Sequence, residues 1–386
     1  MDILLIVIFA ILLIWIIIKV FNHSGDDYNR GTDNYNRNAD NYDRGDEPKN
    51  NKKSSSSIFS IFSNKTDSKK PYRPLFSDYF YSPFDKQAIK WCANLLNLEE
   101  SELKNILEDI PSHYKSFRIG KRSGGYRIIS APNEKLLNLQ KTIYNRILLS
   151  VNIHPTATGF RKEMSIVNNA KPHLGKDMIL KMDIMDFFGS IHLYTVTKTF
   201  EKIGYPKNIS EVLAALCCLK KKLPQGAPTS PALSNIVAYE MDKQLTSLSK
   251  EHYLTYTRYA DDMTFSGDIP NQNTLIAAIT KIVKKEGFAI KIKKTRFLPK
   301  NRRKIVTGIS ISSGEKMTIP KAKKRELRKN IHFILTKGLA QHQRHIKSND
   351  PAYLKRILGY LSFWLSIEPD NQYVIKSIKA LKKLQK

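Results

Sequence analysis

The sequence is 386 residues long, enough for two or three packed subdomains around a large core. Its 64 Lys and Arg residues outnumber 35 Asp and Glu residues, and the formal net charge is +29. This excess is too widespread for one localisation signal and implies a polyanionic partner, with nucleic acid ranked before a membrane, although a basic scaffold protein would also fit. Three cysteines without metal-site spacing, Cys92, Cys217 and Cys218, predict reduced structural thiols in a cytosolic compartment.

An unbroken apolar run from Ile3 to Ile18 opens the chain and is followed by Lys19. A helix needs about 20 residues to span a bilayer core, so the run predicts one short transmembrane helix over residues 1–22. A cleaved signal peptide is the alternative, but no basic residue precedes the run and no small-residue cleavage site follows it. The basic residues after the run place the bulk of the chain in the cytoplasm by the positive-inside rule.

A seven-residue repeat follows, with Tyr at positions 28, 35 and 42 and Arg at positions 30, 37 and 44. The period would suit a coiled coil, but Asn, Asp and Gly are poor helix formers and each heptad lacks a second apolar position. We therefore predict a flexible linker over residues 23–70. A weak nucleic-acid-binding tail is the alternative, because Tyr and Arg can stack on bases.

Two adjacent carboxylates, Asp261 and Asp262, lie within the aromatic and β-branched stretch from Tyr256 to Phe265. This composition predicts an extended hairpin that turns at Ala260-Asp261-Asp262. Adjacent acids are costly as bare anions and become favourable around a divalent cation. An acidic surface turn is the alternative, but the apolar flanks place the carboxylates at the end of a core hairpin.

A second apolar strand, Ile179 to Ile191, carries Asp183 and Asp186. A buried apolar strand that bears an Asp such as Asp183 needs a partner for that charge. Enough chain separates Asp183 from the Asp261 hairpin for intervening helices to return a neighbouring strand to one sheet. Between them the Pro-rich turn from Leu223 to Pro231 leads into a helical stretch at residues 232–245.

Upstream of these strands, the spacing predicts helices at residues 89–98 and 103–110, with Ser101 as an N-cap. Two β-like runs between Phe117 and Ser130 then bracket a basic glycine turn, which predicts a hairpin with a positively charged tip. That tip is either an exposed loop or a phosphate clamp.

Three motifs now point to one family. Tyr259-Ala260-Asp261-Asp262 resembles the YxDD motif of reverse transcriptases, and Lys181-Met182-Asp183 through Phe188 resembles their first catalytic block. Leu223-Pro224-Gln225-Gly226 resembles their LPQG turn. The three occur in the family's order, and the resemblance covers about residues 115–310.

Two more motifs are similar to those of bacterial retron reverse transcriptases. Asn169 to His173 matches the NAxxH pattern, and Val306-Thr307-Gly308 matches the VTG triplet. No maturase, DNA-binding or endonuclease segment is expected after the thumb-like end, which argues against a group II intron enzyme.

The resemblance implies an α+β right-hand polymerase with fingers, a palm built on an antiparallel sheet, and a helical thumb. The expected organisation is a transmembrane helix (1–22), a disordered linker (23–70), an N-terminal helical extension (71–115), fingers and palm (116–315) and a thumb-like helical domain (316–386).

The resemblance also assigns the chemistry. It implies that Asp183, Asp261 and Asp262 are catalytic and that, with the backbone carbonyl of Ile184, they hold two Mg²⁺ ions. One ion would activate the primer hydroxyl and the other would neutralise the triphosphate and the leaving pyrophosphate. Asp186 is either a structural acid or a contributor to the site.

Nucleotide binding is assigned by the same resemblance to Lys121, Arg127, Phe188, Gln225, Gly226 and Lys294. Phe188 would be the steric gate that crowds a ribose 2′-OH, while Phe187 fits a core position, because the two face opposite ways in an extended segment. Lys294 is either a proton donor near the pyrophosphate or a solvated lysine.

In retrons the enzyme copies its cognate structured non-coding RNA, primed from a guanosine 2′-OH, into a branched RNA–DNA hybrid. The partners implied are that RNA, its DNA product, dNTPs, a separate effector in defence against phage, and the inner membrane through the N-terminal helix. Candidates for RNA binding are Asn169, His173, Val306, Thr307 and Gly308. Two alternatives stay open: another bacterial reverse transcriptase, such as a defence-associated or diversity-generating one, and a membrane-tethered RNA-binding scaffold.

Overall fold

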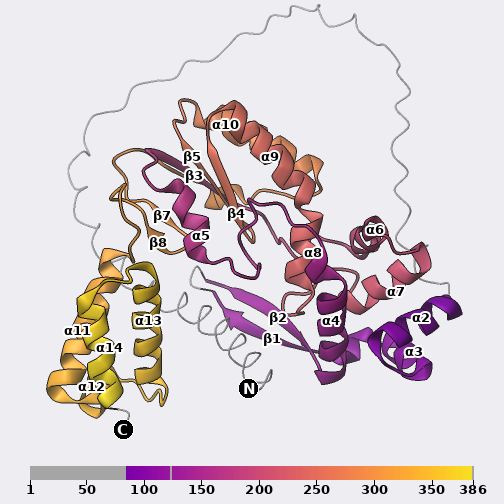
Figure 1. Cartoon of the computed structure of the whole chain (residues 1–386), viewed down its shortest axis with the longest axis horizontal. Helices are drawn as coiled ribbons and strands as arrows, with labels where there is room; N and C mark the ends of the chain where they lie inside the picture. Colours follow the sequence, from indigo (N-terminus) through magenta and orange to yellow (C-terminus); the bar gives the residue numbers. More distant parts are fainter. Residues whose placement is uncertain (1–83, 122–123, 385–386) are drawn as a thin grey trace, which may run out of the picture. The chain divides into compact units, whose positions relative to one another are not determined.

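The structure, a computed structural model, describes residues 84–121 and 124–384 (Figure 1). The predicted transmembrane helix and the linker with its repeat lie outside these residues. Among the helices that the structure does describe, none has both the length and the apolar character needed to cross a bilayer.

Two short helices open the described region: α2 (Lys86–Leu96) and α3 (Glu100–Glu108). The α2 helix begins where the Asp85 carboxylate accepts a hydrogen bond of 2.9 Å from the Ala88 amide, and it ends at Asn97 in a left-handed conformation. The prediction of Ser101 as an N-cap is wrong, because Ser101 lies inside α3, whose N-cap is Glu99.

The predicted basic hairpin is present. A 3₁₀ turn, η1 (Ile110–His113), leads into β1 (Tyr114–Gly120), which pairs antiparallel with β2 (Tyr126–Pro132). At the tip the Lys121 amide donates to the Gly125 carbonyl at 2.9 Å. The helix α4 (Glu134–Arg146) then starts at Asn133, whose side chain accepts from the Leu136 amide, and is followed by η2 (Leu148–Ser150).

The central sheet, which we call the palm sheet, has four strands in the order β4-β5-β3-β6, and each neighbouring pair is antiparallel. Its strands are β3 (Met178–Asp183), β4 (Thr255–Tyr259), β5 (Asp262–Gly267) and β6 (Arg296–Leu298). The β4–β5 hairpin confirms the turn predicted at the paired acids. The predicted α+β class with an antiparallel sheet is confirmed as well.

In chain order, helices precede, separate and follow the strands of this sheet. They are α5 (Ile166–Ala170) with η3 (Lys171–His173), α6 (Leu193–Ile203), α7 (Lys207–Cys217), α8 (Ser230–Val237), α9 (Tyr239–Glu251) and α10 (Gln272–Lys285), and η4 (Ile292–Lys294) precedes β6. The helix expected at residues 232–245 is divided into α8 and α9 at Ala238, where ψ is 3°. Pro231 lies in the first turn of α8, where its missing amide hydrogen costs nothing.

The C-terminal part contains a small hairpin and four helices: β7 (Ile305–Val306), β8 (Ile309–Ser310), α11 (Lys321–Lys337), α12 (Leu339–His345), α13 (Tyr353–Ile367) and α14 (Gln372–Lys383). Figure 1 shows these four helices as one group. Their buried core, which includes Trp364, also contains Val306, Ala170 and Ile179 of β3. The helical end is thus packed onto the palm sheet through apolar contacts.

Basic residues of α11 lie partly on this core rather than wholly in solvent. The Lys323 ammonium lies 3.9 Å from the centre of the Tyr360 ring, and Lys324 and Arg328 lie over the Trp364 ring. Lys324 also forms an ion pair of 2.7 Å with Glu368. Part of the predicted charge run therefore stabilises the helical group, since cations over aromatic faces and paired charges both contribute to stability.

Candidate active site

The palm sheet brings the three predicted catalytic acids to one edge. In the β3–β5 ladder the last residue of β3, Asp183, is opposite the first residue of β5, Asp262. The Ile184 amide donates to the Asp261 carbonyl at 2.9 Å, which ties the end of β3 to the β4–β5 turn. Strand register therefore places Asp183, Asp261 and Asp262 side by side, although Asp183 is distant from the other two in the chain.

The turn that carries Asp261 has an unusual backbone. Tyr259 and Asp262 pair across the hairpin, so Ala260 and Asp261 form a two-residue loop. Ala260 has φ of +56°, a left-handed conformation that suits tight hairpin loops but is uncommon for a residue with a Cβ. The Arg258 side chain donates from Nη1 to the Ala260 carbonyl at 3.0 Å and so holds this conformation.

The three carboxylates repel one another. Burial, and then the charges of Asp262 and Asp183, raise the pKa of Asp261 to about 6. Burial also raises the pKa of Asp262, and the Asp183 charge adds to that shift. A cation bound between the carboxylates would offset this penalty, because a nearby positive charge favours the ionised form of an acid. Clustered carboxylate oxygens are the donors that a hard divalent cation such as Mg²⁺ prefers, so the residues fit one.

Lys294 is a partner of these acids, although 48% of its side chain is exposed to solvent. Its Nζ donates to Asp183 Oδ2 at 2.7 Å. Burial lowers the pKa of Lys294, but the hydrogen bond to Asp183 and the charges of the three acids outweigh burial and raise it. Within residues 84–121 and 124–384, no group of three His, Cys, Asp or Glu side chains is arranged closely enough to hold a metal ion. At the catalytic edge the Asp183 carboxylate accepts a hydrogen bond from Lys294.

The segment after Asp183 is a tight turn. Asp186 is exposed with φ of +46°, and its carboxylate lies against Gly189, where an added Cβ would come within 2.2 Å of Oδ2. This contact supports the structural alternative for Asp186. Phe187 is buried and Phe188 is half-buried, with ring centres 5.7 Å apart. The core position expected for Phe187 is confirmed, but the segment is a turn and not extended, so the condition under which the two rings would face opposite ways is not met.

The other candidates for nucleotide binding lie on two connected elements. Lys121 and Arg127 are exposed on the β1–β2 hairpin. The Gln225 carbonyl accepts from the Ser130 amide of β2 at 2.8 Å, so the predicted LPQG turn is attached to that hairpin. Gly226 has φ of +130°, and an added Cβ would lie 2.6 Å from the Ser130 carbonyl oxygen, so only glycine fits there.

The residues predicted to bind RNA form a buried cluster, which we call the interior lock. Asn169 and His173 have no exposed surface, and Val306 and Thr307 are buried, while Gly308 is half-buried. The His173 ring bonds to Ser266 at 2.6 Å and to Thr257 at 2.8 Å. A direct RNA contact does not fit the Asn169, His173, Val306 and Thr307 side chains, because protein surrounds them.

Asn169 connects the interior lock to the rest of the palm. Its Oδ1 accepts from Thr158 at 2.8 Å, and its Nδ2 donates to Thr307 Oγ1 at 3.4 Å. Thr307 in turn donates to the Ile166 carbonyl at 3.1 Å. The NAxxH and VTG motifs therefore bind each other, and together they join β4, β5 and the β7–β8 hairpin.

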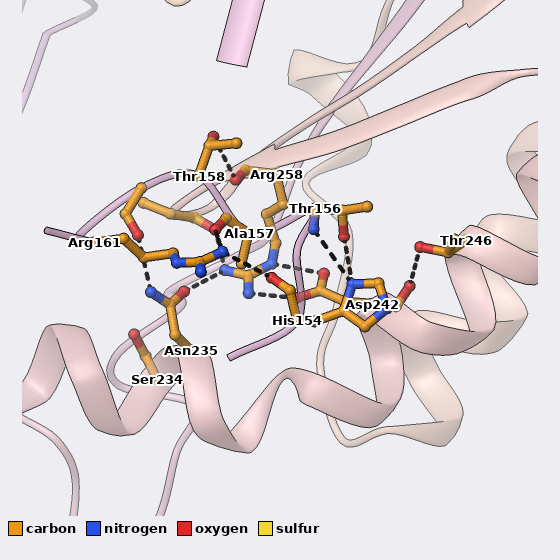
Figure 2. A network of polar contacts seen from close by, with 12 residues as sticks. His154, Thr156, Ala157, Thr158, Arg161, Ser234, Asn235, Asp242, Thr246 and Arg258 are labelled. Carbon is orange, nitrogen blue, oxygen red and sulfur yellow. Dashed lines mark hydrogen bonds and ion pairs between the residues drawn. The ribbon is translucent and has the colours of Figure 1, made fainter. Parts of the chain in front are cut away.

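A fully buried ion pair supports the catalytic turn, and the sequence did not predict it. Arg258 of β4 donates to Asp242 of α9 through Nη2 at 2.6 Å and Nε at 2.8 Å, and Figure 2 shows the two side chains pointing toward one another. Tyr256 also donates to Asp242, and Asn235 of α8 accepts from Arg258 at 3.1 Å. A signal was available: Arg258 is the one cation in an aromatic and β-branched strand predicted to lie in the core, and a buried cation needs a partner.

Removing one member of this pair should destabilise the fold strongly. We expect Asp242→Ala to lower the free energy of unfolding by about 3–5 kcal/mol, because it leaves a buried guanidinium without its counter-charge. Urea unfolding measures the loss. The exposed pair between Lys135 and Glu102 is the matched control, and Glu102→Ala should cost no more than about 1 kcal/mol. Equal losses in the two variants would contradict the assigned role.

His173 should make the protein sensitive to acid. Burial, and then the Lys176 charge, lower the pKa of His173 to about 3 from an unfolded value of about 6.5. The folded state therefore binds fewer protons than the unfolded state between these values, and the free energy of unfolding should fall as the pH drops below about 6.5. Urea unfolding at about pH 7.5 and about pH 5.5 measures this loss, which should be smaller in His173→Gln.

The exposed His252 supplies the control for that measurement. His252→Gln should keep the pH dependence of the unmodified chain. An unchanged pH dependence in His173→Gln would show that His173 does not titrate on unfolding.

Comparison with known proteins fits this geometry. The family described as reverse transcriptase (RNA-dependent DNA polymerase) matches residues 119–327. The Retron Ec86 reverse transcriptase of Escherichia coli is 36% identical over 279 residues, which cover 71% of this chain and 82% of that protein. The Retron Mx65 reverse transcriptase of Myxococcus xanthus is 33% identical, over 67% of this chain and 62% of that protein. The chain therefore belongs to the reverse transcriptase family, as a bacterial retron reverse transcriptase and an RNA-directed DNA polymerase.

Proposed function

We propose that this enzyme copies part of a cognate structured non-coding RNA into DNA, starts from a guanosine 2′-OH in that RNA, and yields a branched RNA–DNA hybrid. The observation that carries the proposal is the meeting of Asp183, Asp261 and Asp262 at one edge of the palm sheet. The similarity to retron enzymes and the net charge of +29 support an RNA partner.

Asp183, Asp261 and Asp262, with the Ile184 carbonyl, would hold two Mg²⁺ ions. The bound ions would supply charge neutralisation at the triphosphate and would lower the pKa of the attacking hydroxyl. The Lys294 ammonium, whose pKa is raised by the hydrogen bond to Asp183 and the charges of the three acids, then faces the same edge. It can donate a proton to the leaving pyrophosphate from Nζ.

The remaining nucleotide contacts follow from the surface that each residue occupies. Exposed Lys121 and Arg127 would bind the triphosphate, Arg127 through a bidentate fork and Lys121 as a point charge. Gln225 and Gly226 would line the nucleotide pocket and the template. The half-buried ring of Phe188 would exclude a ribose 2′-OH, so that Phe188→Ala admits ribonucleotides.

RNA binding would use exposed cations and not the interior lock. Five Lys and Arg residues of α11 are exposed: Lys321, Arg325, Arg328, Lys329 and Lys337. We propose that they contact phosphates of the duplex, since phosphate contacts by Lys and Arg dominate nucleic-acid affinity. The interior lock would act on RNA binding indirectly, because it fixes the β7–β8 hairpin. Gly308 lies in the turn of that hairpin and is half-buried.

The test of this function uses the full chain purified with the RNA encoded beside its gene. Branched DNA should form, and Asp261→Asn should abolish it, because that change removes one carboxylate from the catalytic edge. Asp268→Asn, an exposed carboxylate just after β5, is the matched control and should retain synthesis.

The other outcomes of that experiment separate the alternatives. Unbranched DNA would indicate another bacterial reverse transcriptase. Tight RNA binding without any DNA would indicate a scaffold. Full activity of Asp261→Asn would contradict the assigned chemistry.

We also propose that the enzyme acts with a separate effector protein in defence against phage, and that residues 1–22 hold it at the inner membrane with its catalytic part in the bacterial cytoplasm. The apolar run from Ile3 to Ile18 supports the anchor, because its length nearly matches a bilayer core.

Membrane fractionation of the full chain and of a chain that lacks residues 1–21 measures that anchor. The full chain should sediment with the membrane and the shortened chain should not, because burial of the apolar run drives insertion. Equal distribution of both forms would exclude the anchor.

A further inference from the structure

Four aromatic rings lie beside the catalytic turn, those of Phe160, Phe187, Phe188 and Tyr259, and Phe160 was not among the predicted site residues. The Phe160 ring centre lies 5.9 Å from that of Phe188 and 6.3 Å from that of Tyr259, the first residue of the YxDD motif. Phe187 approaches Phe188 at 5.7 Å. The ring of Phe188 is therefore contacted by Phe187 and by Phe160, at distances where aromatic rings attract one another.

The loop that carries Phe160 is fixed to the strand before the catalytic turn. Ala157 forms a parallel bridge with Arg258, the Thr158 amide donates to the Arg258 carbonyl at 2.8 Å, and the Arg258 amide donates to the Thr156 carbonyl at 2.8 Å. Figure 2 shows these loop residues beside Arg258, together with Asn235. The loop thus extends the palm sheet next to β4.

Gly159 lets this loop approach the catalytic turn closely. A Cβ added at Gly159 would lie 2.7 Å from the Ala260 nitrogen and 3.2 Å from the Tyr259 carbonyl carbon. Asn235 Nδ2 donates to the Gly159 carbonyl at 2.9 Å, and Asn235 Oδ1 accepts from Arg258. The buried ion-pair network therefore holds the turn with Asp261 and the loop with Phe160 together.

Phe160 itself is held in a costly conformation. Its φ is +60°, which is a genuine outlier for a bulky residue, and 41% of its surface stays exposed. Burial in the core therefore does not account for the strained backbone. Strain of this kind persists where the surrounding structure imposes it, and it concentrates at functional sites.

We propose that Phe160 is a positioning residue for sugar discrimination: it holds the Phe188 ring in the orientation that excludes a ribose 2′-OH. The inference rests on the proposed gate role of Phe188. Phe188 lies on a tight turn and is half-buried, so without Phe160 its ring loses one of its two aromatic contacts and gains rotamer freedom. A mobile ring tolerates the ribose that a fixed ring rejects.

The test measures kcat/KM for a dNTP and for the matching rNTP with the full chain and its RNA. Phe160→Ala should lower the ratio of the two values by roughly tenfold, the scale of one or two aromatic contacts, mainly through faster rNTP use. Phe160→Tyr keeps the ring and should keep the ratio. Tyr194→Ala, an exposed aromatic on α6, is the matched control and should leave the ratio unchanged.

A double variant separates positioning from an independent effect. Because Phe160 acts through Phe188, Phe160→Ala should not lower the ratio further when Phe188→Ala is already present. If Phe160→Ala lowers dNTP and rNTP use equally, or leaves the ratio intact while Phe188→Ala lowers it, the positioning role is overturned and the gate stands. If Phe188→Ala itself leaves the ratio intact, the gate proposal fails and the inference fails with it.

Discussion

Mutual repulsion among three carboxylates is the constraint around which this palm is built. The antiparallel register of β3 and β5 fixes Asp183 opposite Asp262, and the β4–β5 turn adds Asp261 at the same edge. Burial first, and then the charges of Asp262 and Asp183, raise the pKa of Asp261, so each makes the ionised form of this acid less favourable. Lys294 offsets part of it through Asp183, and a divalent cation can offset the remainder. A site that is unfavourable by itself is thereby ready for a positively charged cofactor.

Such a site needs a rigid support, and the buried pair of Arg258 and Asp242 provides one. Arg258 bonds to α9 through Asp242, to α8 through Asn235 and to the catalytic turn through the Ala260 carbonyl. A bidentate buried pair is costly to desolvate, but it defines geometry well because both partners lose their alternatives. One guanidinium thus sets the positions of two helices, the turn with Asp261 and the neighbouring Phe160 loop.

The interior lock has a similar function between the palm and the C-terminal helices. His173 joins β4 to β5, and Asn169 reaches the β7–β8 hairpin through Thr307. The apolar core around Trp364 continues into the same region through Val306. Two motifs that resemble recognition elements in the sequence are therefore structural in their buried members, and recognition is left to the exposed surface that they support.

The sequence by itself determined the hairpin with its paired acids and the basic hairpin with its glycine tip, because residue alternation and turn composition act between neighbours in the chain. The class of the fold followed from the resemblance of its motifs to those of reverse transcriptases. The identity of Asp183, Asp261 and Asp262 as candidates also followed from short motifs. Only the tertiary structure decided that Asn169 and His173 are interior, that Arg258 pairs with Asp242, and that the Phe160 ring contacts Phe188. Each of these contacts depends on how distant segments of the chain pack together. Local periodicity in the sequence does not specify that packing.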